Sequence, residues 1–373
     1  MRTFNVLFTG DFLDESGHVT MDTIGLDLLD HVPYIRTGFL LDQKPAPNDP
    51  GYWDRLYSLE IGPHHLTEAN GLVVCRPWVK ASAFSHGAAN LVVIGRTGAG
   101  YDKIDLEACT ANDVAVFTSP HSLTHSTASA ALLLLLALAK RLPEQERMAH
   151  SGCWSRQDEI AGDDLPDRTL GIVGLGHTGS ELARLVAPFK MCVLAYSPHA
   201  DPSRAKGLGV TLVPTLDELL RESDFISLHC RLEERTRHMI GERELRLMKP
   251  TAYFINVARG ELVHQDVLVR CLREHWIAGA ALDVFEEEPL PAGDPLLELD
   301  NAILTPHYLP ATRQAGRATI HSILRGMLLT AEGRLPENIL NTEVVDRPGF
   351  RAKLARFARG LNERARANSH ALV

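Results

Sequence analysis

Three polar residues of this sequence, Arg259, Glu288 and His307, have side chains suited to proton transfer beside a bound anion. Each follows a short segment typical of a strand, and ligands of open α/β sheets bind beyond the carboxyl ends of strands. Removing hydride from a 2-hydroxy acid requires a base, a carboxylate that orients the base, and a fixed cation for the substrate carboxylate. Each residue also has an ordinary interpretation: Arg259 as a structural salt bridge, Glu288 as a solvated loop acid, and His307 as a helix-start residue.

A glycine pattern lies between a β-branched run and a helix-type run, at Gly174-Leu175-Gly176-His177-Thr178-Gly179. In such a turn Gly174 permits the tight bend, Gly176 lets a pyrophosphate approach the backbone, and Gly179 lets the helix pack closely on the strand. The amides at the start of the helix then receive the phosphates. The pattern predicts dinucleotide binding, and its alternative is an ordinary corner between a strand and a helix.

A second glycine-containing loop, Arg96-Thr97-Gly98-Ala99-Gly100, directly follows a strand-type segment. Its bare backbone amides could hold an anion such as a carboxylate. A plain glycine turn agrees with this spacing equally well.

The histidine and cysteine positions do not suggest a metal site or a disulfide framework. The six cysteines are scattered singly, and His121 and His125, four residues apart, have no third ligand beside them in the sequence. Polar residues at a helix start are the better interpretation of these two histidines. Because scattered thiols are typical of the reducing cytoplasm, we expect a cytoplasmic protein without a bound metal.

The composition is that of a globular protein long enough for two domains. Of the 373 residues, 45% are hydrophobic and 23% are charged, and the net charge is −9. This negative balance argues against a nucleic-acid surface. The longest apolar run, 128–139, is shorter than the about 20 residues that span a bilayer, and residues 1–8 resemble a first strand rather than a signal peptide.

Strands and helices are expected to alternate along most of the chain, which predicts α/β domains with parallel sheets. The expected strands are 5–9, 71–75, 91–95 and 114–118, followed by 169–173, 192–196, 225–229, 253–257 and 277–282. We expect a doubly wound dinucleotide-binding domain from 120 to 304. Residues 1–119 and 305–345 would form a discontinuous substrate domain, and 346–373 a tail that looks like a surface helix with a frayed end.

One predicted helix, about 122–141, is apolar on every face in its central part, 130–139, and is expected to end at Pro143. A helix with this pattern must be buried all round. At a domain junction a second subunit is the expected cover, so we expect a homodimer through 122–141.

Several longer motifs resemble those of the D-isomer-specific 2-hydroxyacid dehydrogenases. In order along the chain they are 98–105, 174–179, 256–263, 281–290 and 305–307. The resemblance runs from about residue 72 to about residue 341. It implies two Rossmann-like or flavodoxin-like domains with parallel sheets and with the active site in the interdomain cleft, and a dimer interface on the long apolar helix.

The resemblance implies that Arg259, Glu288 and His307 are the catalytic residues of an NAD(P)-dependent oxidoreductase acting on 2-oxo and D-2-hydroxy acids. His307 would exchange the proton of the C2 hydroxyl while nicotinamide takes the hydride. Glu288 would hydrogen-bond the imidazole, fix its tautomer and favour its charged form. Arg259 would bind the substrate carboxylate and polarise the carbonyl group.

The resemblance also implies which residues surround the two ligands. Substrate contacts would come from Arg76, Gly98, Ala99 and Gly100, together with Arg259. Cofactor contacts would come from Gly174, Gly176, His177, Thr178, Gly179, Ser197, His229, Cys230, Ala258 and Asp283, with Asp283 contacting the nicotinamide carboxamide.

Ser197, at the end of the strand after the glycine pattern, departs from the family pattern. Chains that bind NAD usually carry an acid about 20 residues beyond the glycines, where it bonds the ribose hydroxyls. The neutral serine removes the repulsion toward a 2′-phosphate, and Arg204 and Lys206 follow it. We therefore expect NADP slightly more than NAD.

Three further segments depart from the family pattern. Residues 127–129 lack an acid that the family often has, 308–310 (Tyr-Leu-Pro) are bulkier than the usual small residues, and 75–78 replace a more polar loop, which disfavours 3-phosphoglycerate. Glyoxylate or hydroxypyruvate is our first expectation for the substrate. The alternative from another functional class is a dinucleotide-sensing corepressor or scaffold with little turnover.

Overall fold

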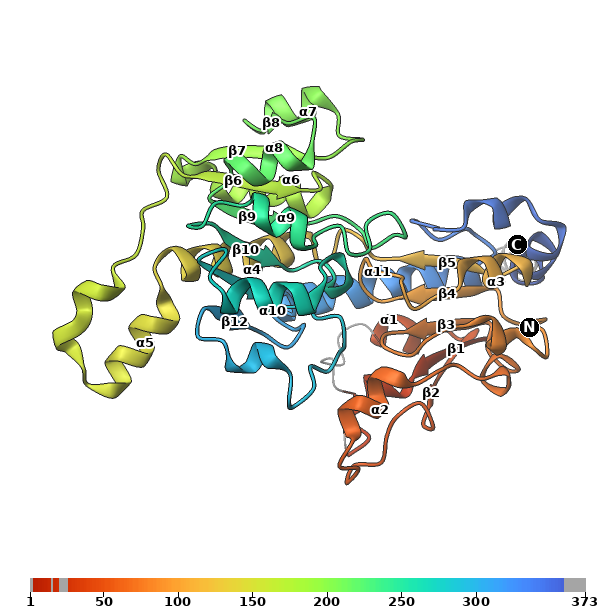
Figure 1. Ribbon diagram of the computed structural model, residues 1–373. Helices are drawn as coiled ribbons and strands as arrows, with labels where there is room; N and C mark the ends of the chain where they lie inside the picture. Colours follow the sequence, from red (N-terminus) through yellow and green to blue (C-terminus); the bar gives the residue numbers. More distant parts are fainter. Residues whose placement is uncertain (1–2, 15, 20–25, 359–373) are drawn as a thin grey trace. The chain divides into compact units, whose positions relative to one another are not determined.

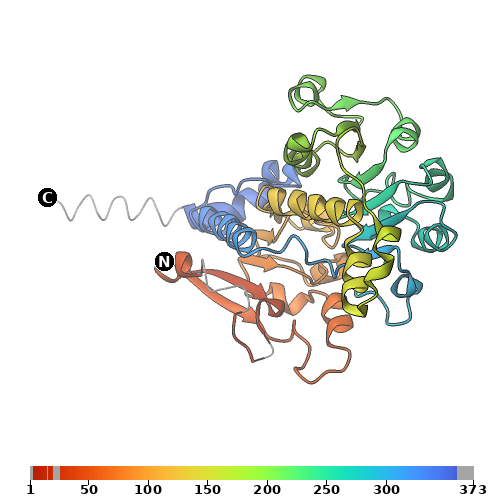
Figure 2. The same ribbon diagram turned by 90° about the vertical axis from the view of Figure 1, so that its left-hand side faces the viewer.

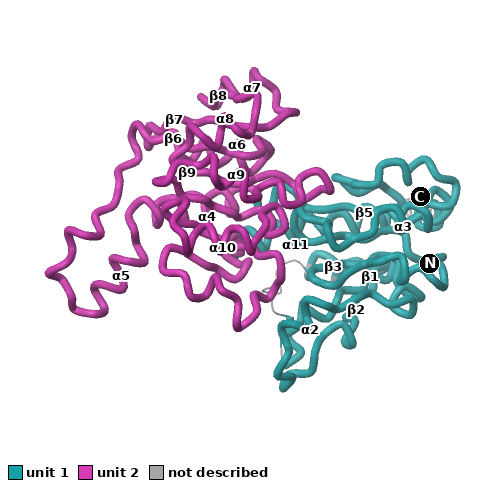
Figure 3. The backbone as a smooth tube through the Cα atoms, viewed as in Figure 1, with its two compact units in different colours: residues 1–123, 313–373 teal, residues 124–312 magenta. Residues whose placement is uncertain are grey.

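The computed structural model describes residues 3–14, 16–19 and 26–358, and the chain divides into two compact units (Figure 3). Unit 1 comprises residues 1–123 and 313–373, and unit 2 comprises residues 124–312. The first domain is thus discontinuous, because the chain leaves it, builds unit 2 and returns.

The sheet of unit 1 has five parallel strands in the order β2-β1-β3-β4-β5 (Figure 1). This is the flavodoxin-like strand order. The strands are β1 (Phe4–Thr9), β2 (Ile35–Leu40), β3 (Gly71–Val74), β4 (Val93–Arg96) and β5 (Ala115–Thr118). Four of them coincide with predicted strands, whereas β2 was not predicted.

Both faces of this sheet are buried. Because successive side chains of a strand point to opposite faces, neighbouring residues of β3 belong to different apolar clusters. On one face Val73 packs in a cluster with Met327 of α11 (Arg313–Ala331), a single long helix in Figure 1 and Figure 2. On the other face Leu72 belongs to a second apolar cluster. Unit 1 also contains the α-helices α1 (Asp27–Asp30), α2 (Tyr52–Ser58) and α3 (Leu106–Ala111).

The sheet of unit 2 has seven parallel strands in the order β12-β11-β10-β9-β6-β7-β8. The strands are β6 (Thr169–Val173), β7 (Cys192–Tyr196), β8 (Thr211–Leu212), β9 (Phe225–Leu228), β10 (Tyr253–Asn256), β11 (Gly279–Leu282) and β12 (Ala302–Leu304). Counted from β6, this is the Rossmann order 3-2-1-4-5-6 with one strand added. The prediction of two Rossmann-like or flavodoxin-like α/β domains with parallel sheets is confirmed.

Helices cover both faces of the unit 2 sheet. Side chains of α4 and α6 form one apolar cluster with Ile172 of β6, and side chains of α8, α9 and α10 form another with Ile226 of β9. The helices are α4 (Thr124–Ala139), α5 (Leu142–Ser151), α6 (His177–Val186), α7 (Pro202–Gly207), α8 (Leu216–Glu222), α9 (Glu242–Leu247) and α10 (Gln265–Arg273). The strand order reverses between β6 and β9, and this switch point is where ligands of such sheets bind.

The predicted helix 122–141 is shorter than expected and is buried mainly within its own unit. α4 ends at Ala139, Arg141 has a φ of 50°, and Pro143 stands in the first turn of α5. The break arises because a left-handed residue cannot continue a right-handed helix. Leu134 and Leu135 are buried in the core of unit 2, and Leu133 is half exposed. A second subunit is therefore not needed to cover most of α4.

α5 and the segment after it extend away from the rest of unit 2 (Figure 1). None of the residues of α5, all of which the structure describes, is buried, and Leu142 and Trp154 are more than half exposed. Within the described residues, no single helix is long and apolar enough to cross a membrane. α4 and α5 satisfy that test only when combined across a bend of 57°.

The helix predicted after residue 346 is present in its described part, and one of its faces is buried. Residues 348–358 are helical, and Phe350 and Phe357 are buried in the core of unit 1. The ring of Phe357 meets that of Phe4 edge to face, with centroids 4.9 Å apart. The predicted frayed end, 359–373, lies outside the described residues.

Candidate active site

The glycine turn connects β6 to α6 and has the geometry that each glycine predicts. Gly174 has a φ of +97°, and a Cβ atom there would lie 2.7 Å from the backbone nitrogen of Cys230. A Cβ atom on Gly179 would lie 2.2 Å from the carbonyl oxygen of Gly174. At Gly176, by contrast, a Cβ atom would meet no heavy atom of the described residues within 4 Å. The turn is thus closed on the protein side and open on the side that a phosphate would approach.

The N-terminus of α6 faces this open side. Gly176 is its N-cap, and no side chain caps it. Gly176 and His177 are exposed, Thr178 is half-buried, and Gly179 is buried against the strand. Uncapped amides at the positive end of a helix are a binding site for anions.

The end of β9 lies directly beside the turn. His229 donates its backbone N–H to the carbonyl oxygen of Val173 (2.8 Å), so the chain after β9 stays paired to β6. Burial lowers the pKa of His229 to about 4 and raises the pKa of Cys230 to about 11. The imidazole is therefore neutral and the thiol protonated near neutral pH.

Ser197 follows β7, on the other side of β6. Its carbonyl oxygen accepts the N–H of Ala200 (3.0 Å), which closes a turn over residues 197–200. Ser197 is half-buried.

Arg259 is held by the loop after β10. The buried side chain of Asn256 accepts the N–H of Ala258 (3.0 Å) and donates to the carbonyl oxygen of Arg259 (2.8 Å). A Cβ atom on Gly260 would lie 1.9 Å from the carbonyl carbon of Phe285, so only glycine lets the two loops pack backbone to backbone. This contact brings the loop of Arg259 against the loop that carries Glu288.

Glu288 and His307 form a hydrogen-bonded pair. The Oε2 atom of Glu288 lies 2.7 Å from Nδ1 of His307, and its Oε1 atom accepts the N–H of Phe285 (3.1 Å). His307 has a φ of 49°, a left-handed conformation that is uncommon outside glycine. Such backbone conformations persist where the surrounding structure fixes them, often at active sites.

Both His307 and Arg259 lower the pKa of Glu288. Burial raises the pKa of Glu288, but the hydrogen bond and charge of His307, the Phe285 N–H and the charge of Arg259 hold it below its usual value. The carboxylate is thus ionised near neutral pH. Arg259, Glu288 and His307, which the sequence singled out at three separate strand ends, are brought together in unit 2.

Asp283 has one carboxylate oxygen without a partner. Its Oδ1 atom accepts hydrogen bonds from the Thr305 hydroxyl (2.6 Å) and from the N–H groups of Tyr308 (3.2 Å) and Leu309 (3.3 Å). Its buried Oδ2 atom has no hydrogen-bond partner among the described residues. Burial raises the pKa of Asp283 in spite of the bond from Thr305. A buried, unpaired acceptor of this kind fits a donor supplied by a ligand, such as a carboxamide.

In unit 1, Arg76 is fixed by the buried carboxylate of Asp11. The Oδ2 atom of Asp11 accepts the backbone N–H of Arg76 (2.8 Å) and lies 3.7 Å from its Nη1 atom. Burial lowers the pKa of Arg76, but Cys75, Asp11 and Tyr57 together hold it above its usual value. Asp11 was not predicted, because a contact across 65 residues leaves no local pattern.

The glycine loop after β4 offers fewer amides than predicted. Gly98 already donates its N–H to the hydroxyl of Ser119 (3.0 Å). The amides of Ala99 and Gly100 donate no hydrogen bond within the described residues, and Ala99 is exposed. An anion would therefore bind the amides of Ala99 and Gly100, whereas Gly98 would only set the conformation of the loop.

Known proteins match this chain over most of its length. The family described as "D-isomer specific 2-hydroxyacid dehydrogenase, NAD binding domain" matches residues 132–308. A glyoxylate reductase of Korarchaeum cryptofilum is 42% identical over 268 residues, which cover 70% of this chain and 80% of that one. The structure of a D-lactate dehydrogenase from Aquifex aeolicus with NAD and lactic acid is 27% identical, with a TM-score of 0.75 over 90% of this chain and 99% of that one.

The chain belongs to the D-isomer-specific 2-hydroxyacid dehydrogenase family. It is thus an oxidoreductase of 2-hydroxy acids that uses a nicotinamide dinucleotide. The open turn at Gly176, the uncapped start of α6 and the unpaired Oδ2 atom of Asp283 fit that cofactor.

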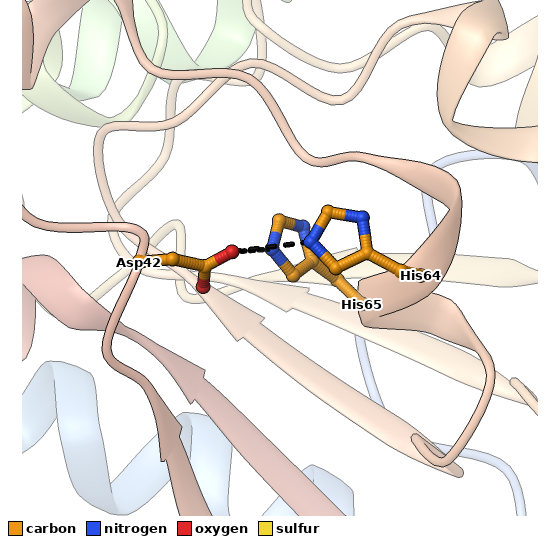
Figure 4. A group of neighbouring side chains, drawn as sticks. All are labelled: Asp42, His64 and His65. Carbon is orange, nitrogen blue, oxygen red and sulfur yellow. Dashed lines mark hydrogen bonds and ion pairs between the residues drawn. The ribbon is translucent and has the colours of Figure 1, made fainter.

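This dehydrogenase also has, in unit 1, a cluster of two histidines and an aspartate that was not predicted from the sequence. The Nε2 atoms of His65 and His64 lie 2.7 and 3.1 Å from Oδ2 of Asp42 (Figure 4). Nδ1 of His65 accepts the N–H of Gly62 (2.8 Å), so the single proton of a neutral imidazole must be on Nε2. A nitrogen that donates its proton to a carboxylate cannot ligate a metal. The geometry therefore favours a hydrogen-bonded cluster over a cation site.

Proposed function

We propose that this dehydrogenase interconverts a small 2-oxo acid and its D-2-hydroxy acid, with Arg259, Glu288 and His307 as its catalytic residues. The observation that carries the proposal is the Glu288–His307 pair, 2.7 Å apart, with the charge of Arg259 acting on the same carboxylate. A base, its orienting acid and a cation are the three groups that this chemistry requires.

The pair assigns the proton transfer to one atom. Because Nδ1 of His307 faces Glu288, the proton on Nδ1 is held by the carboxylate and Nε2 is left for the substrate. In reduction, Nε2 gives its proton to the C2 oxygen, and in oxidation it takes the hydroxyl proton back. Glu288, ionised near neutral pH, stabilises the imidazolium form.

Cations and amides hold the substrate carboxylate and carbonyl. Arg259 presents a planar guanidinium that binds oxygen anions through paired hydrogen bonds. Arg76 and the amides of Ala99 and Gly100 would bind the carboxylate. Asp11 keeps Arg76 charged and oriented.

The nicotinamide dinucleotide supplies the hydride acceptor and donor for C2. Gly174, Gly176, His177, Thr178 and Gly179 would hold the phosphates at the start of α6. His229, Cys230 and Ala258 would line the nicotinamide ring. The Oδ2 atom of Asp283 would accept a hydrogen bond from the carboxamide N–H. Ser197 in place of an acid favours NADP over NAD.

Glyoxylate or hydroxypyruvate is our proposed substrate. The relative from Korarchaeum cryptofilum is named a glyoxylate reductase, and 62% of Tyr308, next to His307, is exposed. Tyr308 is bulkier than the small residues usual at this position in the family, which favours a substrate with a short side chain.

We also infer a homodimer in the cytoplasm. The exposed apolar residues Leu133, Leu142 and Trp154 lie on α4, on α5 and in the segment after it, which one chain leaves uncovered. Exposed large apolar side chains that gather on one segment mark protein interfaces. The free thiols fit a reducing compartment.

A panel of 2-oxo acids with NADH and NADPH tests the proposed activity. Purified enzyme should oxidise the cofactor with glyoxylate or hydroxypyruvate at a kcat of about 1 s⁻¹ or more, and longer side chains should lower kcat/KM. Tight cofactor binding without turnover of any acid would instead indicate a dinucleotide sensor.

A further inference from the structure

Two loops of unit 2, which follow the strands on either side of β6, contact each other. One is the turn 197–200 after β7, and the other is the segment 231–239 after β9. Nη1 of Arg235 lies 3.5 Å from Nε2 of His199, and because a guanidinium only donates, Nε2 accepts. β6 lies between β7 and β9 in the sheet, so this contact joins loops from both sides of the switch point.

The loop that carries Arg235 is tightly ordered. The hydroxyl of Thr236 donates to the carbonyl oxygen of Arg231 (2.7 Å) and accepts the N–H of Glu233 (2.7 Å). Thr236 and Arg237 both donate their N–H groups to the carbonyl oxygen of Glu233. These bonds fix the backbone at Arg235, from which the side chain reaches His199, after β7.

The groups at this meeting point are donors with spare capacity. Arg235 is 64% exposed and gives only Nε to Glu233, at 2.7 Å, while its Nη2 atom makes no other hydrogen bond among the described residues. The hydroxyl of Ser197 makes no hydrogen bond within the described part of the chain, and His199 is exposed. A guanidinium, an imidazole and a hydroxyl together suit a phosphate group.

The nearby acids are not placed to bind the ribose hydroxyls instead. Asp201 is the N-cap of α7, and its Oδ1 atom accepts the N–H (2.9 Å) and the hydroxyl (2.6 Å) of Ser203. Glu233 is engaged by Arg235 itself. The place of the usual acid, at the end of β7, is left to Ser197.

We propose that Arg235, with His199 and Ser197, recognises the 2′-phosphate of NADP(H). The inference rests on the proposed function for its biological meaning, and Arg235 was not among the predicted cofactor contacts. Arg204 and Lys206, which follow Ser197 in the sequence, are placed differently. Arg204 acts on the Asp201 carboxylate, and Lys206 lines a hollow with Val210 and Leu212. Arg235 reaches the end of β7 from a strand two positions away in the sheet.

Binding of cofactor fragments to the full-length protein tests this assignment without any turnover. The probes are 2′,5′-ADP and 5′-AMP, which differ only in the 2′-phosphate, measured by isothermal titration calorimetry. The wild type should bind 2′,5′-ADP at least about tenfold more tightly than 5′-AMP, and Arg235→Gln should remove this preference while leaving 5′-AMP affinity within about twofold. The matched control is Arg221→Gln, an exposed arginine on α8 that faces Asp217.

The assignment is overturned if the wild type binds both fragments equally, or if Arg235→Gln and Arg221→Gln behave alike. Rising ionic strength should weaken the 2′,5′-ADP preference of the wild type, since an exposed ion pair is screened. A protein that prefers 2′,5′-ADP through Arg235 yet reduces no 2-oxo acid refutes the proposed function and keeps this inference. A protein that reduces glyoxylate with NADH and shows no preference does the reverse.

Discussion

The residues that carry the chemistry are few, and each is fixed by a neighbour on the same or an adjacent loop. Asn256 shapes the backbone before Arg259, and the N–H of Phe285 holds Glu288. Glu288 in turn fixes the ring of His307. This chain of contacts determines which imidazole nitrogen faces the substrate, and it runs entirely through unit 2.

Replacing Glu288 with Gln tests the electrostatic part of this arrangement. The amide keeps one acceptor oxygen, which can serve either the Phe285 N–H or His307, and it loses the negative charge that stabilises an imidazolium. We expect kcat for 2-oxo acid reduction to fall about 10²-fold, and the alkaline limb of its pH profile to move about 1 unit lower. Glu287→Gln, at the exposed neighbouring position, is the matched control and should leave both unchanged.

The stability of the folded protein should also depend on the charge of the Glu288 carboxylate. Because the pKa of Glu288 is below its usual value, the contact stabilises the fold above the unfolded-state pKa of about 4.3 and is lost as the pH falls through the folded-state pKa. The Tm advantage of the wild type over Glu288→Gln should therefore be present at pH 7 and shrink below about pH 4. An advantage that grows in acid would contradict the assigned direction.

At the scale of elements, the turn between β6 and α6 was predictable because all of its determinants are local. Strand, glycines and helix follow within twenty residues, and each glycine has a backbone reason for its place. β2 was missed because Arg36, Thr37 and Gly38 interrupt its apolar pattern, and β8 because it has only two residues. The end of α4 was predicted from Pro143, whereas the positive φ of Arg141, which separates α4 from α5, has no local signature in the sequence.

Two alanine substitutions in this turn separate folding from binding. Gly174→Ala places a Cβ atom against Cys230 at a positive φ, so we expect Tm to fall by at least about 4 °C. Gly176→Ala meets open space and should leave Tm within about 1 °C while weakening dinucleotide binding about tenfold. Thermal unfolding and cofactor titration of both variants provide the comparison, and equal losses of Tm would refute the division of roles.

At the scale of the whole molecule, the alternation of strands and helices predicted both α/β domains, and the structure confirms them. The helix after residue 346 was predicted, but its buried face was not, because arginine and alanine dominate its composition. Phe350, Leu354 and Phe357 are spaced as one face of a helix, a local pattern that indicates this buried face. Contacts such as Asp11 with Arg76 join distant positions, and no local pattern encodes them.

The proposed dimer involves the whole molecule, and substitution of Trp154 tests it. Trp154 is 66% exposed in one chain, and Trp53, in unit 1, is 58% exposed and serves as the matched control. We expect Trp154→Ala to raise the dimer dissociation constant at least about tenfold and Trp53→Ala to leave it unchanged, by sedimentation equilibrium. A wild type that is monomeric at micromolar concentration, or an unaffected Trp154→Ala variant, would contradict the proposed interface.

The central claim is that one imidazole, held by Glu288, transfers the proton at C2, and His307→Asn tests it most directly. Asparagine tolerates the left-handed backbone of this position, so the fold and the cofactor site should be preserved. We predict that kcat for glyoxylate or hydroxypyruvate falls at least about 10³-fold while the Kd for the reduced cofactor stays within about twofold. A variant that keeps more than about a tenth of wild-type turnover would contradict the account.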